Sequence, residues 1–188
     1  VEKSIKHGSI LSVVAAENQR GVFGKQFGSV EKFASSLKRV STTVVRAPFF
    51  LENLWGDAGT VKSHDTFYAP IDGDTKQLMA AVADVGDAVA AAAMNAEKFA
   101  GKIVHVIGAN VSKNEIAALY SKKLGRDIKL VQASEEAATK AFEPYGMPAW
   151  QVKGVIELFG INETDAFVKA HENEFEELVK RKPMSVAT

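Results

Sequence analysis

The chain has 188 residues, of which 46% are hydrophobic and 24% charged, the composition of a globular domain with a buried core. Its 23 basic and 23 acidic residues balance to a net charge of zero, which disfavours binding to nucleic acid or to an anionic membrane surface. Because cysteine is absent and no apolar run is long enough for a transmembrane helix, we expect a soluble intracellular protein without disulfides whose partner is a small ligand or another protein.

The N-terminal part predicts a parallel βαβ unit. Ser9–Ala16 is a short apolar run typical of a buried strand. A loop containing glycines follows, then Ser29–Leu37 with apolar residues at helical spacing, and then the β-branched strand Ser41–Arg46. Ligands of such units lie beyond the carboxyl ends of the strands, here at Ala15–Asn18 and Ala47–Asn53.

Strands and helices continue to alternate as far as residue 131, and only helices follow. The capping box Ser112–Glu115 opens a helix that stops at Gly125, and Asp84 is predicted to cap another. The remaining predicted strands are Thr66–Ala69, Leu78–Val82, Lys102–Gly108 and Ile128–Val131, and the remaining helices are Asp84–Met94, Ser134–Phe142, Pro148–Phe159, Thr164–His171 and Asn173–Lys180.

The first predicted strand needs neighbours on both sides. It is apolar on both faces, yet only the mixed polar stretch Val1–Gly8 precedes it. Because a parallel sheet is buried on both faces and normally has several strands, we expect an N-terminal βαβ half in front of Val1.

Several short motifs between about Ser9 and Phe159 resemble the NmrA-like family of atypical short-chain dehydrogenases. The most recognisable is Arg46-Ala47-Pro48-Phe49-Phe50-Leu51-Glu52-Asn53. Others in the order of that family are Ser12-Val13-Val14, Arg20-Gly21-Val22-Phe23-Gly24, Gly101-Lys102, Leu124-Gly125-Arg126 and Gly146-Met147-Pro148.

The resemblance implies an α/β fold with a partial Rossmann-type parallel sheet and a ligand cleft beside a C-terminal helical subdomain. Residues 1–132 would be the C-terminal part of an NAD(P)-binding domain with interleaved subdomain elements, and residues 133–188 the helical subdomain. The family's glycine-rich turn, which holds the pyrophosphate, would precede Val1. We therefore expect NAD or NADP in a full-length form and none on this chain alone. The spacing Gly21-x-x-Gly24-x-x-x-Gly28 follows the wrong strand to replace that turn.

The resemblance also implies a loss of acid-base residues. Active short-chain dehydrogenases use Tyr-x-x-x-Lys, in which lysine lowers the pKa of the tyrosine that passes a proton to the substrate. The matching positions hold Phe23 and Phe27, so no catalytic residue of this type is predicted. Lys25 lies between them and is the one candidate left for contact with a ribose or carbonyl oxygen.

The candidate cofactor-binding residues follow from the same alignment. Phe49 and Phe50 would form the wall on the nicotinamide side, and Asn53 would fix their loop. The full set is Ser12, Lys25, Pro48, Phe49, Phe50 and Asn53. The histidines, His7, His64, His105 and His171, are scattered without metal-like spacing, so no metal site is predicted.

Three functions remain open. The first is a redox sensor or binding protein of the NmrA type, with little or no turnover and with a protein partner or small ligand. The second is an NAD(P)H-dependent reductase of a quinone or other carbonyl compound. The third is a structural subunit of a larger assembly that covers the exposed sheet edge and supplies the missing contacts. The expected partners are therefore a protein or the N-terminal half. The absence of tyrosine and lysine at the matching positions favours the first and the third of these functions.

Overall fold

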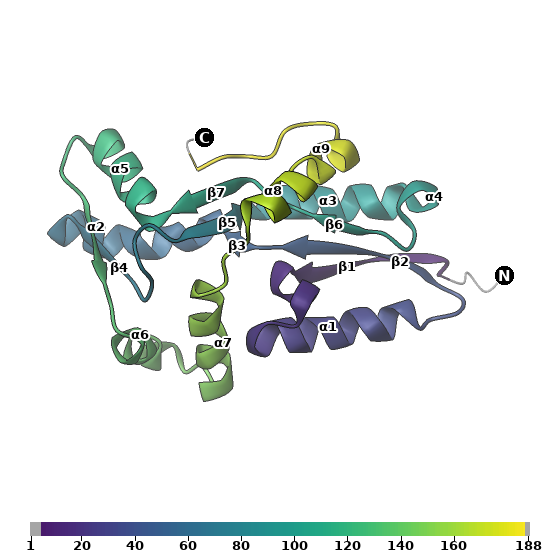
Figure 1. Ribbon diagram of the computed structural model, residues 1–188, viewed down its shortest axis with the longest axis horizontal. Helices are drawn as coiled ribbons and strands as arrows, with labels where there is room; N and C mark the ends of the chain where they lie inside the picture. The colour runs from purple at the N-terminus through teal and green to yellow at the C-terminus, as the bar shows by residue number, and fades with distance from the viewer. Residues whose placement is uncertain (1–4, 187–188) are drawn as a thin grey trace.

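The computed structural model describes residues 5–186, which form small β-sheets covered by helices (Figure 1). The strands are β1 (His7–Val13), β2 (Ser41–Ala47), β3 (Phe49–Phe50), β4 (Thr66–Ala69), β5 (Lys76–Ala80), β6 (Ile103–His105), β7 (Ala109–Ser112) and β8 (Lys129–Gln132). The α-helices are α1 (Gly21–Ser35), α2 (Ala58–His64), α3 (Val82–Met94), α4 (Ala96–Phe99), α5 (Lys113–Leu124), α6 (Glu135–Ala141), α7 (Ala149–Phe159), α8 (Asp165–His171) and α9 (Glu174–Val179). Short 3-10 helices are η1 (Val14–Asn18), η2 (Leu51–Asp57) and η3 (Glu143–Tyr145).

The strands pair mainly in parallel, as predicted. In the first sheet β2 lies between β1 and β6 and is parallel to both, with Val44 opposite Ile10 on one side and Ile103 on the other. The chain then passes Pro48 into β3, which is parallel to β5 in a second sheet. A third, parallel pair joins β4 and β8. The pairing of β5 with β7 is antiparallel and was not predicted.

Helices cover both faces of the first sheet. In Figure 1, α1 lies below β1 and β2, whereas α3 and α9 lie above the sheet. Buried side chains from the strands, including Val45 and Val104, pack in one cluster with Phe175 and Leu178 of α9. A helix from the end of the chain therefore belongs to the core of the N-terminal strands. The division of the chain at residue 132 stays a prediction.

Strand β1 differs from its predicted form. It starts at His7, earlier than predicted, and its expected last residues, Val14 to Ala16, turn into η1. Residues 1–4 of the polar stretch lie outside the described residues. Within residues 5–186, β1 pairs with β2 on one edge only, and Leu11 on it is 45% exposed. The expected N-terminal βαβ half stays a prediction.

This open edge leads to a prediction about self-association. An unpaired strand with exposed apolar side chains is a template for pairing with another chain. We expect the purified protein to self-associate and the substitution Leu11→Lys to raise the monomer fraction, because a charge on an edge strand opposes pairing. Light scattering after size-exclusion chromatography measures both. A monodisperse monomer before any substitution would contradict the prediction.

The capping box of α5 is confirmed, whereas the cap predicted at Asp84 is wrong. The Ser112 hydroxyl accepts a bond from the Glu115 N–H (3.2 Å), and the Glu115 carboxylate accepts one from the Ser112 N–H (2.8 Å). Helix α3 begins at Val82 instead. Asp84 is fully buried in its first turn, pairs with Arg181 at 2.7 Å and accepts a bond from the Met184 N–H. The carboxylate therefore ties the C-terminal segment to α3.

No helix within the described part of the chain has the length and apolar character needed to cross a lipid bilayer.

Candidate functional site

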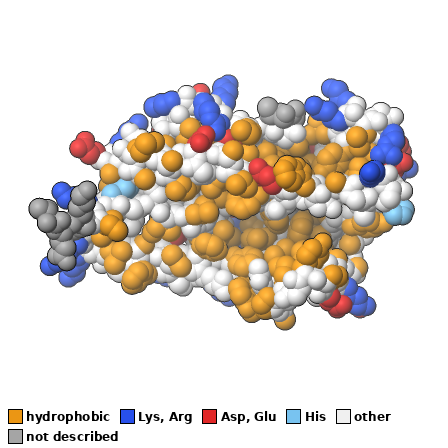
Figure 2. Space-filling model, turned by 180° about the vertical axis from the view of Figure 1, so that it is seen from behind, with side chains coloured by type: hydrophobic (Ala, Val, Ile, Leu, Met, Phe, Trp, Pro, Cys, Tyr) orange, Lys and Arg blue, Asp and Glu red, His pale blue; other side chains and the backbone are white. Residues whose placement is uncertain are grey.

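A cavity of about 690 Å³ lies at the carboxyl ends of β1 and β2. Parallel strands usually present their ligand sites at this edge. The lining residues come from β1, η1, α1, the end of β2 with the segment after it, β5, the residue after α6, and α7 with the residues that follow it: Leu11, Ser12, Val13, Val14, Ala15, Phe23, Phe27, Ala47, Pro48, Phe49, Phe50, Asn53, Gly56, Leu78, Phe142, Val155, Leu158, Phe159, Ile161 and Glu163. Viewed from behind, the molecule has hydrophobic side chains gathered around a hollow (Figure 2), in keeping with this lining.

Five of the six predicted binding residues meet at this cavity. Ser12, Pro48, Phe49, Phe50 and Asn53 all line it. Pro48 separates β2 from β3, so the two phenylalanines follow the strand end directly. Their contact with a ligand stays a prediction.

Lys25, the sixth, is not among the lining residues. Its side chain is exposed on α1, between Gly24 and Gln26. The contact of Lys25 with a ribose stays a prediction. Among the described residues that line the cavity there is no lysine.

Phe23 and Phe27 occupy the side of the cavity formed by α1. The ring of Phe23 packs edge-on against Trp150 with 6.3 Å between centroids, and it lies against Gly154, where a Cβ would approach the ring to 2.9 Å. These contacts fix the Phe23 ring between α1 and α7. Phenyl rings can bound a ligand but cannot exchange protons with it.

Aromatic side chains from two elements form one wall of the cavity. Phe49 and Phe159 both line it, with 5.0 Å between their ring centroids and their planes tilted by 43°. Phe67, by contrast, belongs to a separate core with Met79, and Trp55 is 79% exposed. The aromatic wall is therefore shared between β3 and α7.

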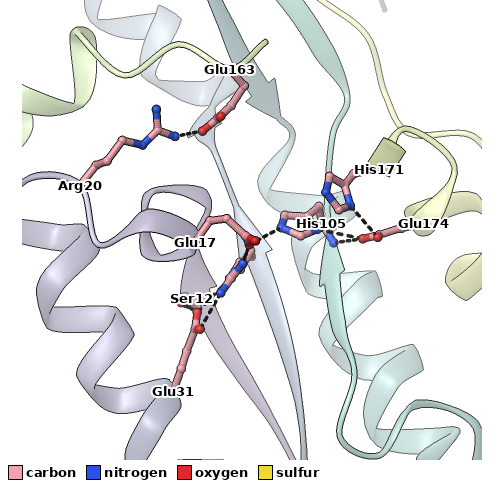
Figure 3. Close-up of polar contacts among 9 residues, drawn as sticks. Ser12, Glu17, Arg20, Glu31, His105, Glu163, His171 and Glu174 are labelled. Carbon is pink, nitrogen blue, oxygen red and sulfur yellow. Dashed lines mark hydrogen bonds and ion pairs between the residues drawn. The ribbon is translucent and has the colours of Figure 1, made fainter. Parts of the chain in front are cut away.

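The hydroxyl of Ser12 is held by an ion-pair network at α1 (Figure 3). It donates to the carboxylate of Glu31, which also receives two bonds from Arg46, at 3.1 Å from Nε and 2.8 Å from Nη2. Arg46 is only 5% exposed and pairs in addition with Glu17. The partner of the Ser12 hydroxyl is thus a carboxylate.

Glu163 is the sole ionisable side chain among the described residues that line the cavity. It forms an ion pair with Arg20 at the start of α1 (Figure 3), and Arg20 also donates to the carbonyl of Asn162 at 3.2 Å. Burial lowers the pKa of Arg20 from its ordinary value. The carboxylate in the described lining is therefore already paired with a guanidinium group.

A buried lysine that the sequence did not single out lies behind the aromatic wall. Lys113 follows the cap of α5, and its ammonium lies 5.7 Å from the ring centre of Phe159. Burial lowers the pKa of Lys113, and the carboxylate of Asp57 opposes this shift. Because Phe159 lines the cavity and Lys113 does not, this charge is close to the site but outside its lining.

The glycine series after β1 is helical, so the predicted loop is wrong. Gly21 starts α1, and the next N–H, of Val22, donates to Glu157 of α7 at 2.6 Å. Gly24 packs on η1, where a Cβ would lie 2.6 Å from the Ala15 carbonyl oxygen. These glycines therefore serve helix packing, and the helix N-terminus already has a carboxylate partner.

Gly24→Ala tests this packing role. We expect it to lower the free energy of unfolding by about 1–3 kcal/mol, because backbone atoms must move to admit the methyl group. Gly59→Ala in α2 is the matched control, since a Cβ there meets nothing within 4 Å. It should raise stability by up to about 1 kcal/mol. Urea unfolding measures both, and equal effects would refute the packing role.

Comparison with known proteins identifies one family. Residues 17–187 match the NmrA-like family. No curated protein sequence matches the chain.

Three solved structures illustrate the similarity in fold. An NADPH-dependent quinone oxidoreductase from Escherichia coli, complexed with NADPH, shares 19% identity at a TM-score of 0.78 over 97% of this chain and 63% of its own. A nucleoside-diphosphate-sugar epimerase from Staphylococcus aureus shares 21% sequence identity with a TM-score of 0.72, and the match covers 96% of this chain and 63% of the epimerase. The negative transcriptional regulator NmrA, in complex with NADP, shares 20% sequence identity with a TM-score of 0.57, and the match covers 69% of this chain and 44% of the regulator.

The chain thus spans less than two thirds of these proteins. At such identities the likeness establishes the fold alone, and it confirms the predicted partial Rossmann-type α/β architecture. The regulator and the reductase have the same fold, so fold does not decide between regulation and catalysis.

Proposed function

Because the chain belongs to the NmrA-like family, we propose that it is a regulatory binding protein whose cavity holds a small, flat ligand without turning it over. The observation that carries this proposal is the lining itself. Phe23 and Phe27, which the sequence resemblance assigns to the tyrosine and lysine positions of active relatives, contribute phenyl rings to it, and Glu163 is ion-paired. Removing general acid-base help typically costs about 10²–10⁴-fold in rate.

The ligand is proposed to be the ring end of a nicotinamide cofactor or a quinone-like compound. Phe49, Phe50 and Phe159 offer apolar and aromatic surface for a planar ring. The described residues do not fit the pyrophosphate of a dinucleotide, because the glycines of α1 are packed and the Val22 N–H at its start donates to Glu157. Binding of NAD or NADP is therefore proposed for a full-length form only.

The open edge of β1 is proposed to be covered in the working protein. A parallel strand, from an N-terminal βαβ half or from a protein partner, would complete the sheet and add surface beside the cavity. What supports this proposal is the edge of β1 that stays unpaired within residues 5–186.

The test uses the chain as it is, titrated with naphthoquinone and followed by tryptophan fluorescence, since Trp150 contacts Phe23. We expect binding, and we expect Val155→Phe to weaken it about tenfold or more, a change of about 1.4 kcal/mol, because the added ring takes up space in the cavity. Val30→Phe is the matched control, because Val30 is exposed on α1 outside the lining.

Two outcomes would overturn the proposal. If Val155→Phe and Val30→Phe bind naphthoquinone equally well, the cavity is not the site. If the chain oxidises NADPH with naphthoquinone at about 1 s⁻¹ or faster, in the ordinary range of enzymes, it is a reductase. NADPH alone should show no binding at low micromolar concentration by calorimetry.

A further inference from the structure

Two histidines and a glutamate meet at the turn between α8 and α9, beside the end of β6 (Figure 3). His105 lies in β6, His171 ends α8 and Glu174 begins α9. Nδ1 of His105 is 3.0 Å from one oxygen of Glu174, and Nδ1 of His171 is 2.8 Å from the other. The two imidazole rings lie side by side with centroids 4.1 Å apart. Three donors of metal-binding type thus converge on one point.

The three donor atoms suit a divalent transition metal. One ligand atom from each of His105, His171 and Glu174 lies within 4.8 Å of the others. Imidazole nitrogen and carboxylate oxygen are ordinary zinc ligands, at about 2.0–2.2 Å, and two histidines with one glutamate form a known zinc ligand set. Small side-chain movements would bring all three to one ion.

A separate observation on His105 points to a metal. The ring is buried, with 3% of the residue exposed, and its Nε2 has no hydrogen-bond partner. The carboxylate of Glu17 lies 3.7 Å from that nitrogen. Metal-bound histidines normally donate the other ring N–H to a carboxylate, which fixes the tautomer. With a metal on Nδ1, the proton moves to Nε2 and faces Glu17, which satisfies the buried atom.

The surroundings hold the carboxylate ligand in place and leave the site open to solvent. Glu174 also accepts the backbone N–H of His105 at 2.6 Å. The side chains of His171 and Glu174 are 25% and 28% exposed. Solvent can therefore reach the position that a fourth ligand would take.

We propose that His105, His171 and Glu174 form a binding site for a zinc-type divalent cation, with Glu17 orienting His105. The ion would fasten the turn between α8 and α9 to β6, and so hold α9 against the sheet. The site is independent of the cavity ligand, since none of the three residues lines the cavity.

The experiment titrates Zn²⁺ into the purified chain by calorimetry, and Co²⁺ in parallel for its visible absorption. We expect one Zn²⁺ per chain, a raised thermal midpoint and Co²⁺ bands of a four-coordinate site. His171→Asn should weaken Zn²⁺ binding at least about tenfold, since even outer-shell changes cost 10–100-fold. His64→Asn, at an exposed histidine on α2, is the matched control and should bind normally.

His171→Asn keeps an N–H donor for Glu174, so the fold should persist. The thermal midpoint of this variant, measured with a chelator present, checks that it still folds without metal. Glu174→Gln is a second variant, and it must also lose Zn²⁺ binding. The proposal is overturned if the chain binds no Zn²⁺, or if both variants bind it as tightly as the parent protein. Loss of binding in the His64→Asn control would also overturn it.

Discussion

Phe175→Ala is expected to lower the free energy of unfolding by about 3–5 kcal/mol, because the ring is fully buried and its removal leaves a cavity. Phe175 packs from α9 into the cluster that contains Val45 and Val104 of the first sheet. The loss should therefore affect the whole sheet and appear as one cooperative transition. Urea unfolding followed by both fluorescence and circular dichroism measures it.

Phe33→Ala is the control for this change. Phe33 lies on α1 and is 68% exposed, so its truncation should stay within about 0.5 kcal/mol. If Phe175→Ala loosened α9 alone and left the main transition unchanged, α9 would be a separate unit. That outcome would favour the independent helical subdomain expected from the sequence.

Glu31→Ala is expected to lower the free energy of unfolding by about 3 kcal/mol, because it removes the carboxylate that forms a bidentate ion pair with a buried arginine. Arg46 is 5% exposed and donates to both carboxylate oxygens of Glu31. It also pairs with Glu17, which is exposed and contacts it through one oxygen. Equilibrium unfolding in urea measures the cost.

The double variant Glu31→Leu with Arg46→Leu serves as the control. A buried ion pair replaced by apolar side chains is often neutral, whereas removal of one partner is not. The double variant should therefore be more stable than Glu31→Ala. Should it prove less stable than that single variant, the charge of Arg46 would not be the cause of the loss.

Short sequence patterns predicted helices and strands correctly where tertiary packing did not override the propensity of the residues. Ser112 and Glu115 are a reciprocal cap, and such a pattern needs no distant partner to form. The first half of α1 was missed because Gly21, Gly24 and Gly28 disfavour a helix by propensity. The helix forms there because Gly24 allows a close approach to Ala15, which only the folded chain reveals.

Only the part of the candidate site that is formed by residues at the strand ends could be predicted from the sequence. Phe49 and Phe50 follow a strand end, and strand ends gather at one edge of a parallel sheet. The opposite wall, with Val155 and Phe159 of α7, depends on how a distant helix packs, and no local pattern encodes that. The meeting of His105 with His171 was missed for the same reason, since metal spacing was sought along the sequence.

The position of α9 has a consequence for how the protein is made. Because Phe175 and Leu178 pack with Val45 of β2 and Val104 of β6, the core of the first sheet stays incomplete until α9 has been synthesised. The Met184 N–H then donates to Asp84, a bond that joins the segment after α9 to α3. Domains usually fold as units as the chain emerges from the ribosome, and this sheet can gain its full core only once residues 174–184 have emerged.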